Sequence, residues 1–386
     1  MAHFDFIETL PAPPEAVWPF LTDPALMNRW SLASVEGVSE GDGGGFGTVG
    51  ARRQVRLRFG PRTERLNEVI FDADPPRRIE YRVIPNAFVR AHRGEITLSP
   101  APEGSMLRWV VEMEFSLAPF DALATRIVLP DLRRSLGLMR DVVAGAKPPP
   151  TPASRKTSPI DETYVLPALL NEAEATLAAQ RDLAAEYEQK GDPKRWFTRL
   201  YAITTECMIE AFLARAVLHR GWLLRLIPLF HAYYVDNIRR FTGELPGSPE
   251  AHWEKALRRT HAGDAASQLL QGIRMGMIAH IEEDLPRTLA RVYVDHYADK
   301  CEYRRFMADY LLLGPILEEP ASRMLPLLPR ELLPWRFRIA EAMTPDVVRR
   351  LVRIRDGYDV PGRRLDAFGR GERIASLMLE ERRRIG

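Results

Sequence analysis

The chain of 386 residues is longer than a single compact core usually supports, so its length predicts two domains. Hydrophobic residues make up 46% and charged residues 27% of the chain, which excludes a disordered or membrane-embedded composition. The formal net charge of +2 indicates no nucleic-acid partner. Cys207 and Cys301 form no disulfide framework or metal-ligand spacing, and no targeting or transmembrane segment is visible. We therefore expect a cytoplasmic protein.

The first part of the chain is predicted to be an antiparallel sheet followed by one long helix. FDFIETL alternates apolar and polar residues and predicts a strand, and the next residues predict two short helices broken at Asp23-Pro24. Further alternating runs predict strands at ARRQVRLRF, RLNEVIF, RRIEYRVI, AHRGEITL and MLRWVVEMEF. Apolar periodicity then predicts a helix from about Phe120 to Val143.

The alternation within these strands assigns four residues to an inner face. Tyr81, His92, Trp109 and Met113 share parity with apolar neighbours, and side chains two residues apart point to the same side of a sheet. The long helix covers this face and leaves room for a cavity, so these four are the candidate ligand-binding residues. His92 either orients a ligand or exchanges protons with it, or it is a hydrogen-bonded core histidine. Tyr81 either presents its hydroxyl group to a ligand or packs in the core.

This order of elements resembles the START-like (SRPBCC) superfamily, in its polyketide cyclase/dehydrase branch. The resemblance rests on FIETLPAPPEAVWPFLTDPALMNRW, on the GEITLSPAPEGSMLRWVVEMEF hairpin and on the helix that ends in LRRSLGLMRDVV. It implies an α+β helix-grip fold, in which a curved antiparallel sheet surrounds a long C-terminal helix, and a cavity for a small hydrophobic ligand. It does not imply one catalytic set, since a fold does not dictate chemistry.

A proline-rich linker separates the two predicted domains. KPPPTPASRKTSP lacks apolar periodicity and favours an extended chain, so we expect a helix-grip domain at residues 1–146, a linker at 147–160 and a second domain at 161–386. Beyond the linker the apolar period is near 3.6, and helix starts are expected near Asp192-Pro193, Ser248-Pro249 and Asp264. The second domain is therefore predicted to be all-α.

The segment GMIAHIEEDLPRTLARVY contains the candidate catalytic residues. His280 and Asp284 lie four residues apart, on one face of a helix, and Pro286 interrupts that helix. A histidine held by a carboxylate can serve as a base or a metal ligand. In the alternative interpretation, Asp284 caps a new helix that begins at Leu285, and His280 is a hydrogen-bonded core histidine.

A metal site would need further ligands from other helices. His231 and Glu206 are the candidates that would join His280 and Asp284 to bind a divalent metal, the one cofactor that the sequence suggests. Glu-x-x-His and His-Glu-x-x-His are absent from the chain, which argues against ferritin-like and zincin sites. Salt bridges and core hydrogen bonds are the alternative roles of these side chains.

The second domain also resembles a known family, an uncharacterised bacterial all-helical family of unknown function. Its hallmark is Ala-His-Ile-x-x-Asp-Leu-Pro, which is matched here by Ala279, His280, Ile281, Asp284, Leu285 and Pro286. The resemblance covers roughly Asp161 to Leu312 and implies no particular activity. Ile278 stands where the hallmark usually has Asn.

Three functions agree with these patterns. The first is binding and processing of a small hydrophobic metabolite, such as a polyketide, lipid or isoprenoid, with the helical domain as a modifying or gating module. The second is a metal-dependent hydrolase or oxygenase centred on the helical domain. The third is a non-enzymatic carrier or assembly protein. The sequence does not decide whether the protein is an enzyme or a non-enzymatic carrier.

Overall fold

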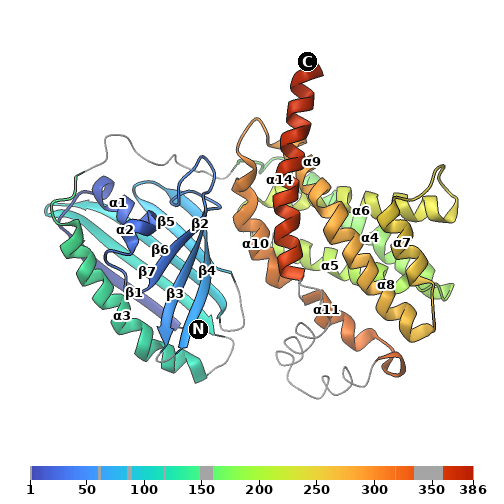
Figure 1. Ribbon diagram of the computed structural model, residues 1–386, viewed down its shortest axis with the longest axis horizontal. Coiled ribbons are helices and arrows are strands. Elements are labelled where there is room, and N and C mark those ends of the chain that lie inside the picture. Colours follow the sequence, from blue (N-terminus) through green and yellow to red (C-terminus); the bar gives the residue numbers. More distant parts are fainter. Residues whose placement is uncertain are drawn as a thin grey trace. The chain divides into compact units, whose positions relative to one another are not determined.

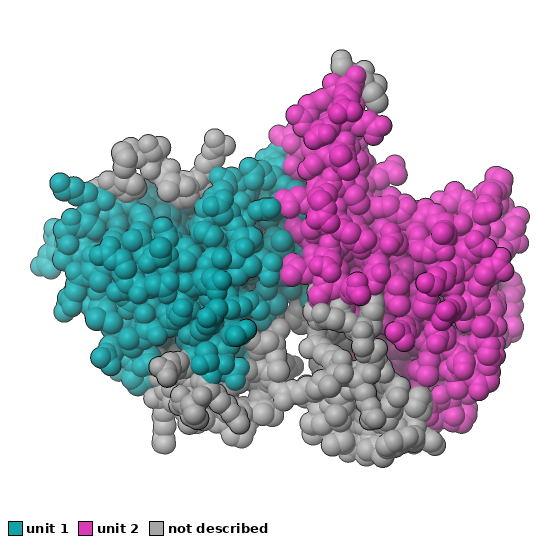
Figure 2. Space-filling model, in the orientation of Figure 1, with its two compact units in different colours: residues 1–160, 300–314 teal, residues 161–299, 315–386 magenta. Residues whose placement is uncertain are grey.

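A computed structural model describes residues 2–59, 62–84, 89–115, 119–147, 160–317, 319–333 and 360–385. The chain divides into two compact units (Figure 2): Met1–Ile160 with Lys300–Gly314, and Asp161–Asp299 with Pro315–Gly386. The predicted linker lies outside the described residues, apart from its end residues Lys147 and Ile160.

The first unit contains an antiparallel sheet of seven strands, in the order β1-β7-β6-β5-β4-β3-β2 (Figure 1). Each alternating run lies within a strand to within one residue at its ends, so the helix-grip fold predicted for this part of the chain is confirmed. The edge strand β2 was not predicted, because SVEGVS has two apolar residues and an internal glycine. The strands are β1 (Ala2–Leu10), β2 (Ser34–Ser39), β3 (Arg52–Phe59), β4 (Arg62–Asp74), β5 (Arg78–Val83), β6 (Val89–Ala101) and β7 (Gly104–Phe115).

Three helices belong to this sheet: α1 (Pro14–Thr22), α2 (Pro24–Met27) and α3 (Pro119–Val143). Asp23 caps α2 by accepting a hydrogen bond from the backbone N–H of Ala25. In Figure 1, α3 runs along one face of the sheet. Met139 of α3 is fully buried in the same apolar core as Leu10, Ile79 and Leu107. Burying each side chain of this size stabilises the fold by about 1.5–3 kcal/mol.

One glycine permits the closest packing within the sheet. Gly94 of β6 pairs with Tyr81 of β5, and a Cβ atom at position 94 would lie 2.2 Å from Cζ of the Tyr81 ring. The Tyr81 ring therefore lies directly over the bare backbone of β6, which a larger residue would prevent. This contact sets the position of the Tyr81 hydroxyl group.

The segment Lys300–Gly314 packs within the first unit, although it follows the helical segments in sequence. Arg305 donates to Oδ2 of Asp42 at 2.7 Å, and the backbone N–H of Glu302 donates to the other oxygen. Both side chains of the Asp42–Arg305 pair are largely buried. Gly50, at φ +85°, leaves room for the carbonyl oxygen of Arg304.

The described part of the second unit is all-helical, as predicted. Asp264 caps α8 by accepting from the backbone N–H of Ser267, as expected for a helix start there. No helix in the described ranges is both long and apolar enough to cross a membrane. The helices are α4 (Leu166–Gln189), α5 (Arg195–Leu213), α6 (Arg220–Thr242), α7 (Ala251–Thr260), α8 (Ala265–Ala279), α9 (Leu285–His296), α10 (Met307–Ile316), which begins in the first unit, α11 (Glu319–Met324) and α14 (Val360–Ile385), with a π-helical turn at His280–Asp284.

Candidate functional site

The first unit encloses a cavity of about 100 Å³. Its lining includes all four residues that the strand alternation assigned to the inner face: Tyr81, His92, Trp109 and Met113. Most of the other lining residues are apolar, among them Leu21, Met27, Trp30, Val55, Leu66, Ile79, Ile96, Val111 and Leu132. The volume is below the range of about 300–1,000 Å³ that is typical of small-molecule sites.

Hydrogen bonds orient three of these side chains. Nε1–H of Trp109 donates to the Tyr81 hydroxyl oxygen at 2.9 Å, and the backbone N–H of Val83 donates to Nδ1 of His92 at 3.3 Å. The neutral His92 ring therefore carries its proton on Nε2. Burial lowers the pKa of His92 to about 4, so the ring is neutral near pH 7. Burial also raises the pKa of Tyr81, so its hydroxyl group keeps its proton.

A buried ion pair in the same cavity was missed by the sequence analysis. Nη2 of Arg53 lies 3.2 Å from Oε2 of Glu68, and the two residues are 2% and 8% exposed. Nη1 of Arg53 donates to the carbonyl oxygen of Leu21, whereas its buried Nε has no hydrogen-bond partner among the described residues. Burial raises the pKa of the Glu68 carboxyl group, and Arg53 offsets that rise only in part.

The strand alternation contained the signal for this pair. Arg53 has the parity of Val55, and Glu68 has the parity of Leu66, and both apolar residues are buried. The two residues were missed because charged side chains are expected on the outer face of a sheet, although the alternation places both of them on the inner face.

In the second unit, Asp284 is the centre of a hydrogen-bonded cluster. His280 Nδ1–H and Trp253 Nε1–H both donate to its Oδ2, at 2.8 and 2.9 Å, and Arg287 donates to its Oδ1 at 2.6 Å. His280 is 4% exposed and Asp284 is fully buried. Burial by itself would raise the pKa of Asp284, but hydrogen bonds from His252 and His280 and the charge of Arg287 hold it well below its usual range.

The interpretation of Asp284 as a helix cap is wrong. The residues His280–Asp284 form a π-helical turn that continues directly into α9, and the Asp284 side chain makes no capping hydrogen bond. Pro286 has no N–H to offer the carbonyl oxygen of Glu282, and Arg370 of α14 donates to that oxygen instead. Single π-helical turns within α-helices occur frequently at functional sites.

Aromatic rings surround His280. Phe230 stacks on its imidazole at 3.7 Å between ring centroids, and Tyr201 meets it edge-on at 4.6 Å. Burial lowers the pKa of His280 despite the attraction of Asp284. Since Nδ1 donates to Asp284, the neutral ring has its lone pair on Nε2, which is buried and has no hydrogen-bond partner among the described residues. The other rings near it are Phe197, Tyr234 and Trp253.

Two of the four proposed metal ligands have other partners. Glu206 forms an ion pair with Arg181 at 2.6 Å, and both side chains are more than one third exposed. Nδ1 of His231 lies 3.4 Å from the amide nitrogen of Gln180, and burial lowers the pKa of His231 to about 4. The structure thus brings His280 and Asp284 into direct contact, but Glu206 has its own counter-charge.

A different set of side chains lies at metal-ligand spacing. In the part of the chain that the structure describes, Glu250, His252 and Asp284 have their donor atoms within 4.8 Å of one another. Arg287, however, donates to Glu250 at 2.7 Å and to Asp284 at 2.6 Å. Its guanidinium group already supplies the positive charge between the two carboxylates, so this set does not fit a divalent metal in this arrangement.

Two families match separate parts of the chain. Residues 1–144 match the family described as polyketide cyclase / dehydrase and lipid transport. Residues 173–356 match a family of unknown function, DUF5995. The predicted resemblance of each half is thereby confirmed. No curated protein matches the chain.

Each of the following solved structures is similar to little more than a third of the chain. A START superfamily protein from Mycobacterium smegmatis is 11% identical, covering 36% of this chain and 98% of that one, with a TM-score of 0.32. Protein MLL2253 from Mesorhizobium loti is 20% identical over 36% and 96% of the chains, with a TM-score of 0.29. The di-domain ARO/CYC BexL from the BE-7585A biosynthetic pathway is 19% identical over 38% and 50%, with a TM-score of 0.31.

Proposed function

We propose that the helix-grip domain, whose residues 1–144 match a polyketide cyclase / dehydrase and lipid transport family, binds a small hydrophobic metabolite that carries an oxygen acceptor. The observation that carries this proposal is the apolar cavity with the buried Arg53–Glu68 pair in its wall. Polyketide, lipid and isoprenoid-like molecules belong to this chemical class.

The cavity wall has side chains that suit both the hydrophobic part and the oxygen acceptor of such a ligand. Its apolar side chains stabilise a bound hydrocarbon by about 25 cal/mol for each Å² removed from water. Two hydrogen-bond donors can orient the polar end: Nε2–H of His92, and Nε–H of Arg53, which has no partner among the residues that the structure describes. A buried donor without a partner costs about 1–3 kcal/mol, and a carbonyl, phenol or carboxylate oxygen of a ligand removes that cost.

The size of the cavity limits the ligand. An engineered apolar cavity of about 150 Å³ is known to hold benzene. The cavity of about 100 Å³ is smaller, so it suits a short chain, and a substituted ring or any larger ligand requires it to widen.

Binding of two small probes tests this proposal. Acetophenone has an oxygen acceptor and ethylbenzene has none, and the methyl group of Met113 reports occupancy of the cavity by NMR. We expect acetophenone to bind about tenfold more tightly, since a hydrogen bond from a charged donor contributes about 1.5–3 kcal/mol. Arg53→Met should weaken this preference, because only the donor of His92 remains, whereas Arg56→Met, in an exposed pair with Glu36, should retain it. Equal binding of the two probes would contradict the role of the donors.

For the helical domain we propose acid–base chemistry at His280. The supporting observation is its buried Nε2, which has no partner in the described part of the chain and lies in a π-helical turn beside Asp284. Asp284 orients the ring and favours the imidazolium that forms when Nε2 accepts a proton. His280 would then modify a metabolite, whereas a carrier would leave all metabolites unchanged.

Incubation of the full chain with a metabolite extract, followed by mass spectrometry, separates these two outcomes. We expect the wild-type protein to consume a metabolite that His280→Gln leaves unchanged. His252→Gln is the matched control, because His252 is partly exposed and contacts the other oxygen of Asp284 at 3.4 Å. Thermal unfolding of both variants verifies that they fold. An extract left unchanged by wild-type protein would favour the non-enzymatic carrier.

Metal content tests the remaining alternative, a metal-dependent hydrolase or oxygenase. We propose that Arg287, and no divalent cation, neutralises Glu250 and Asp284. Elemental mass spectrometry on protein purified without chelator measures this directly. Stoichiometric zinc, iron or manganese that is lost in His280→Gln would overturn the proposal.

A further inference from the structure

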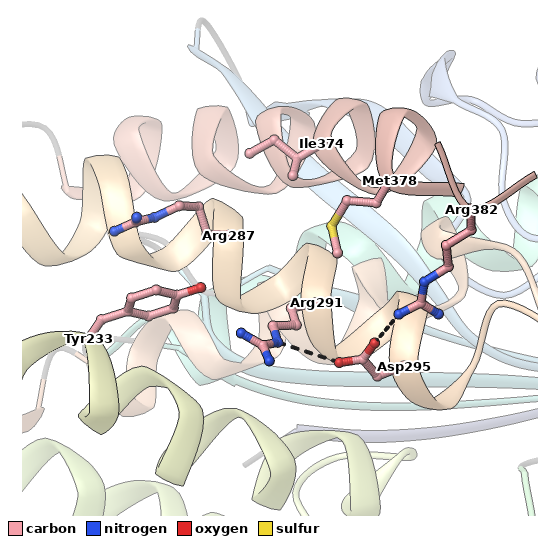
Figure 3. A pocket seen from close by; sticks show the side chains of 7 residues that line it. All are labelled: Tyr233, Arg287, Arg291, Asp295, Ile374, Met378 and Arg382. Carbon is pink, nitrogen blue, oxygen red and sulfur yellow. Dashed lines mark hydrogen bonds and ion pairs between the residues drawn. The ribbon is translucent and has the colours of Figure 1, made fainter. Parts of the chain in front are cut away.

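A second cleft, of about 400 Å³, lies in the helical unit (Figure 3). Its volume is within the range of small-molecule sites. Three helices line it. Helix α6 contributes Tyr233, and α9 contributes Arg287, Arg291 and Asp295. Helix α14 contributes Ile374, Met378 and Arg382.

The charges in this cleft do not balance. Figure 3 shows Asp295 between two arginines: Nε of Arg291 lies 3.5 Å from its Oδ2, and Arg382 donates to its Oδ1. One carboxylate is thus shared by two guanidinium groups, so one positive charge is in excess. Arg287 adds no positive charge to this excess, because Asp284 and Glu250 share its guanidinium group, and that neighbouring trio has one negative charge in excess.

Both arginines are more than half exposed, although Nη1 of Arg382 also donates to the carbonyl oxygen of Val294 at 3.1 Å. The side chains of Arg291 and Arg382 are 57% and 55% exposed. Arg291 contacts Asp295 only through Nε, and its two terminal nitrogens have no partner in the described ranges. A guanidinium group presents a planar set of donors that matches the oxygens of a carboxylate or a phosphate.

Apolar groups line the cleft beside these charges. Ile374 and Met378 are four residues apart on α14, so they lie on one face of that helix. Tyr233 adds an aromatic ring, with the guanidinium group of Arg287 over its face at 4.4 Å. A cationic end next to an apolar wall matches a molecule with an acidic head and a hydrocarbon tail.

We propose that this cleft binds an amphiphilic organic anion: a carboxylate or a phosphate monoester on a short hydrocarbon chain. Arg291 and Arg382 hold the acidic group in competition with Asp295, and Ile374 and Met378 contact the chain. This is a second ligand site, separate from the cavity of the helix-grip domain, and it does not depend on the function proposed for that cavity.

Methyl NMR on the full chain can observe the two sites separately. In protein labelled with methyl-¹³C methionine, Met378 reports the cleft, and Met27 and Met113 report the helix-grip cavity. Met378→Leu assigns the cleft signal. The probes are octanoate, octyl phosphate and the uncharged 1-octanol. We expect both anions to shift the Met378 signal and 1-octanol to bind there about tenfold more weakly, because it lacks the charge-assisted hydrogen bonds. The two anions distinguish a carboxylate from a phosphate site.

Two variants should change the affinity in opposite directions. Arg382→Gln removes a donor and should weaken octanoate binding at Met378 about tenfold. Asp295→Asn removes the competing carboxylate and should tighten it, which loss of folding does not do. Arg258→Ala, in the exposed pair with Glu254 on α7, should have no effect. Equal affinity for octanoate and 1-octanol, or weaker binding in Asp295→Asn, would overturn the proposal. So would an unchanged Met378 signal at probe concentrations that shift Met113.

Discussion

His280 and Asp284 are joined across one π-helical turn, with Nδ1 2.8 Å from Oδ2 and both side chains buried. A buried carboxylate is tolerated only where it is paired and hydrogen-bonded. Trp253, Arg287 and His252 are its other side-chain partners. The same contacts that stabilise the charge of Asp284 fix the orientation of His280, so stability and any chemistry at this position are coupled.

Asp284→Asn tests the contribution of this charge to folding. The amide keeps the shape of the side chain but removes the charge at the fully buried end of the pair and leaves the partly exposed Arg287 with Glu250 alone. We expect the free energy of unfolding to fall by about 3 kcal/mol, which is typical of breaking a buried ion pair from one side. Urea denaturation measures the loss. Glu254→Gln, in an exposed pair with Arg258, should change it by less than about 1 kcal/mol. Similar small losses for both variants would contradict the buried-pair argument.

The neutral state of the partly buried His92 predicts a loss of stability in acid. Its pKa is lowered to about 4 in the folded protein, so between pH 6.5 and 4 the unfolded chain binds the proton first. The contribution of His92 is fully present above pH 6.5 and falls by about 3 kcal/mol as the pH drops to 4. Denaturation at pH 7.5 and at pH 4.5 should show this loss.

The control for this pH dependence is His92→Asn. Its side-chain oxygen can accept the hydrogen bond that Val83 donates to Nδ1, but it does not titrate. The pH dependence of unfolding should be shallower in the variant, with the buried His231 accounting for part of what remains. An identical pH dependence in the two proteins would show that His92 is not buried in its neutral form.

The contact between Gly94 and the Tyr81 ring predicts the effect of one methyl group. In Gly94→Ala, the new Cβ would lie 2.2 Å from the ring, so Tyr81 must move and its bond from Trp109 must break or bend. Overpacking of this kind costs about 1–3 kcal/mol.

Gly137 of α3 is the matched control. A Cβ atom there meets nothing within 4 Å, so Gly137→Ala should be neutral or should stabilise the helix by up to about 1 kcal/mol. Thermal unfolding compares the two alanine variants. A stabilised Gly94→Ala protein would show that Tyr81 does not lie over β6.

Local periodicity was sufficient to predict most of the fold. Strand parity correctly placed Tyr81 and Trp109 in the cavity wall, because side chains alternate between the faces of a strand whatever the strand packs against. Helical spacing in the same way predicted that His280 and Asp284 would meet. Arg53 has the same parity as buried Val55, but the sequence analysis missed it, because a buried charge is expected only once a partner is known, and Glu68 comes from another strand.

The sequence by itself determined the two fold classes, the inner face of the sheet and the His280–Asp284 contact, since each depends on residues close together in the chain. Only the tertiary structure decided which distant side chains meet. Trp253 and Arg287 complete the surroundings of Asp284, Glu206 pairs with Arg181, and Asp295 is shared by Arg291 and Arg382. Such contacts depend on how helices dock, and that is set by the summed packing of many side chains, which no local pattern in the chain encodes.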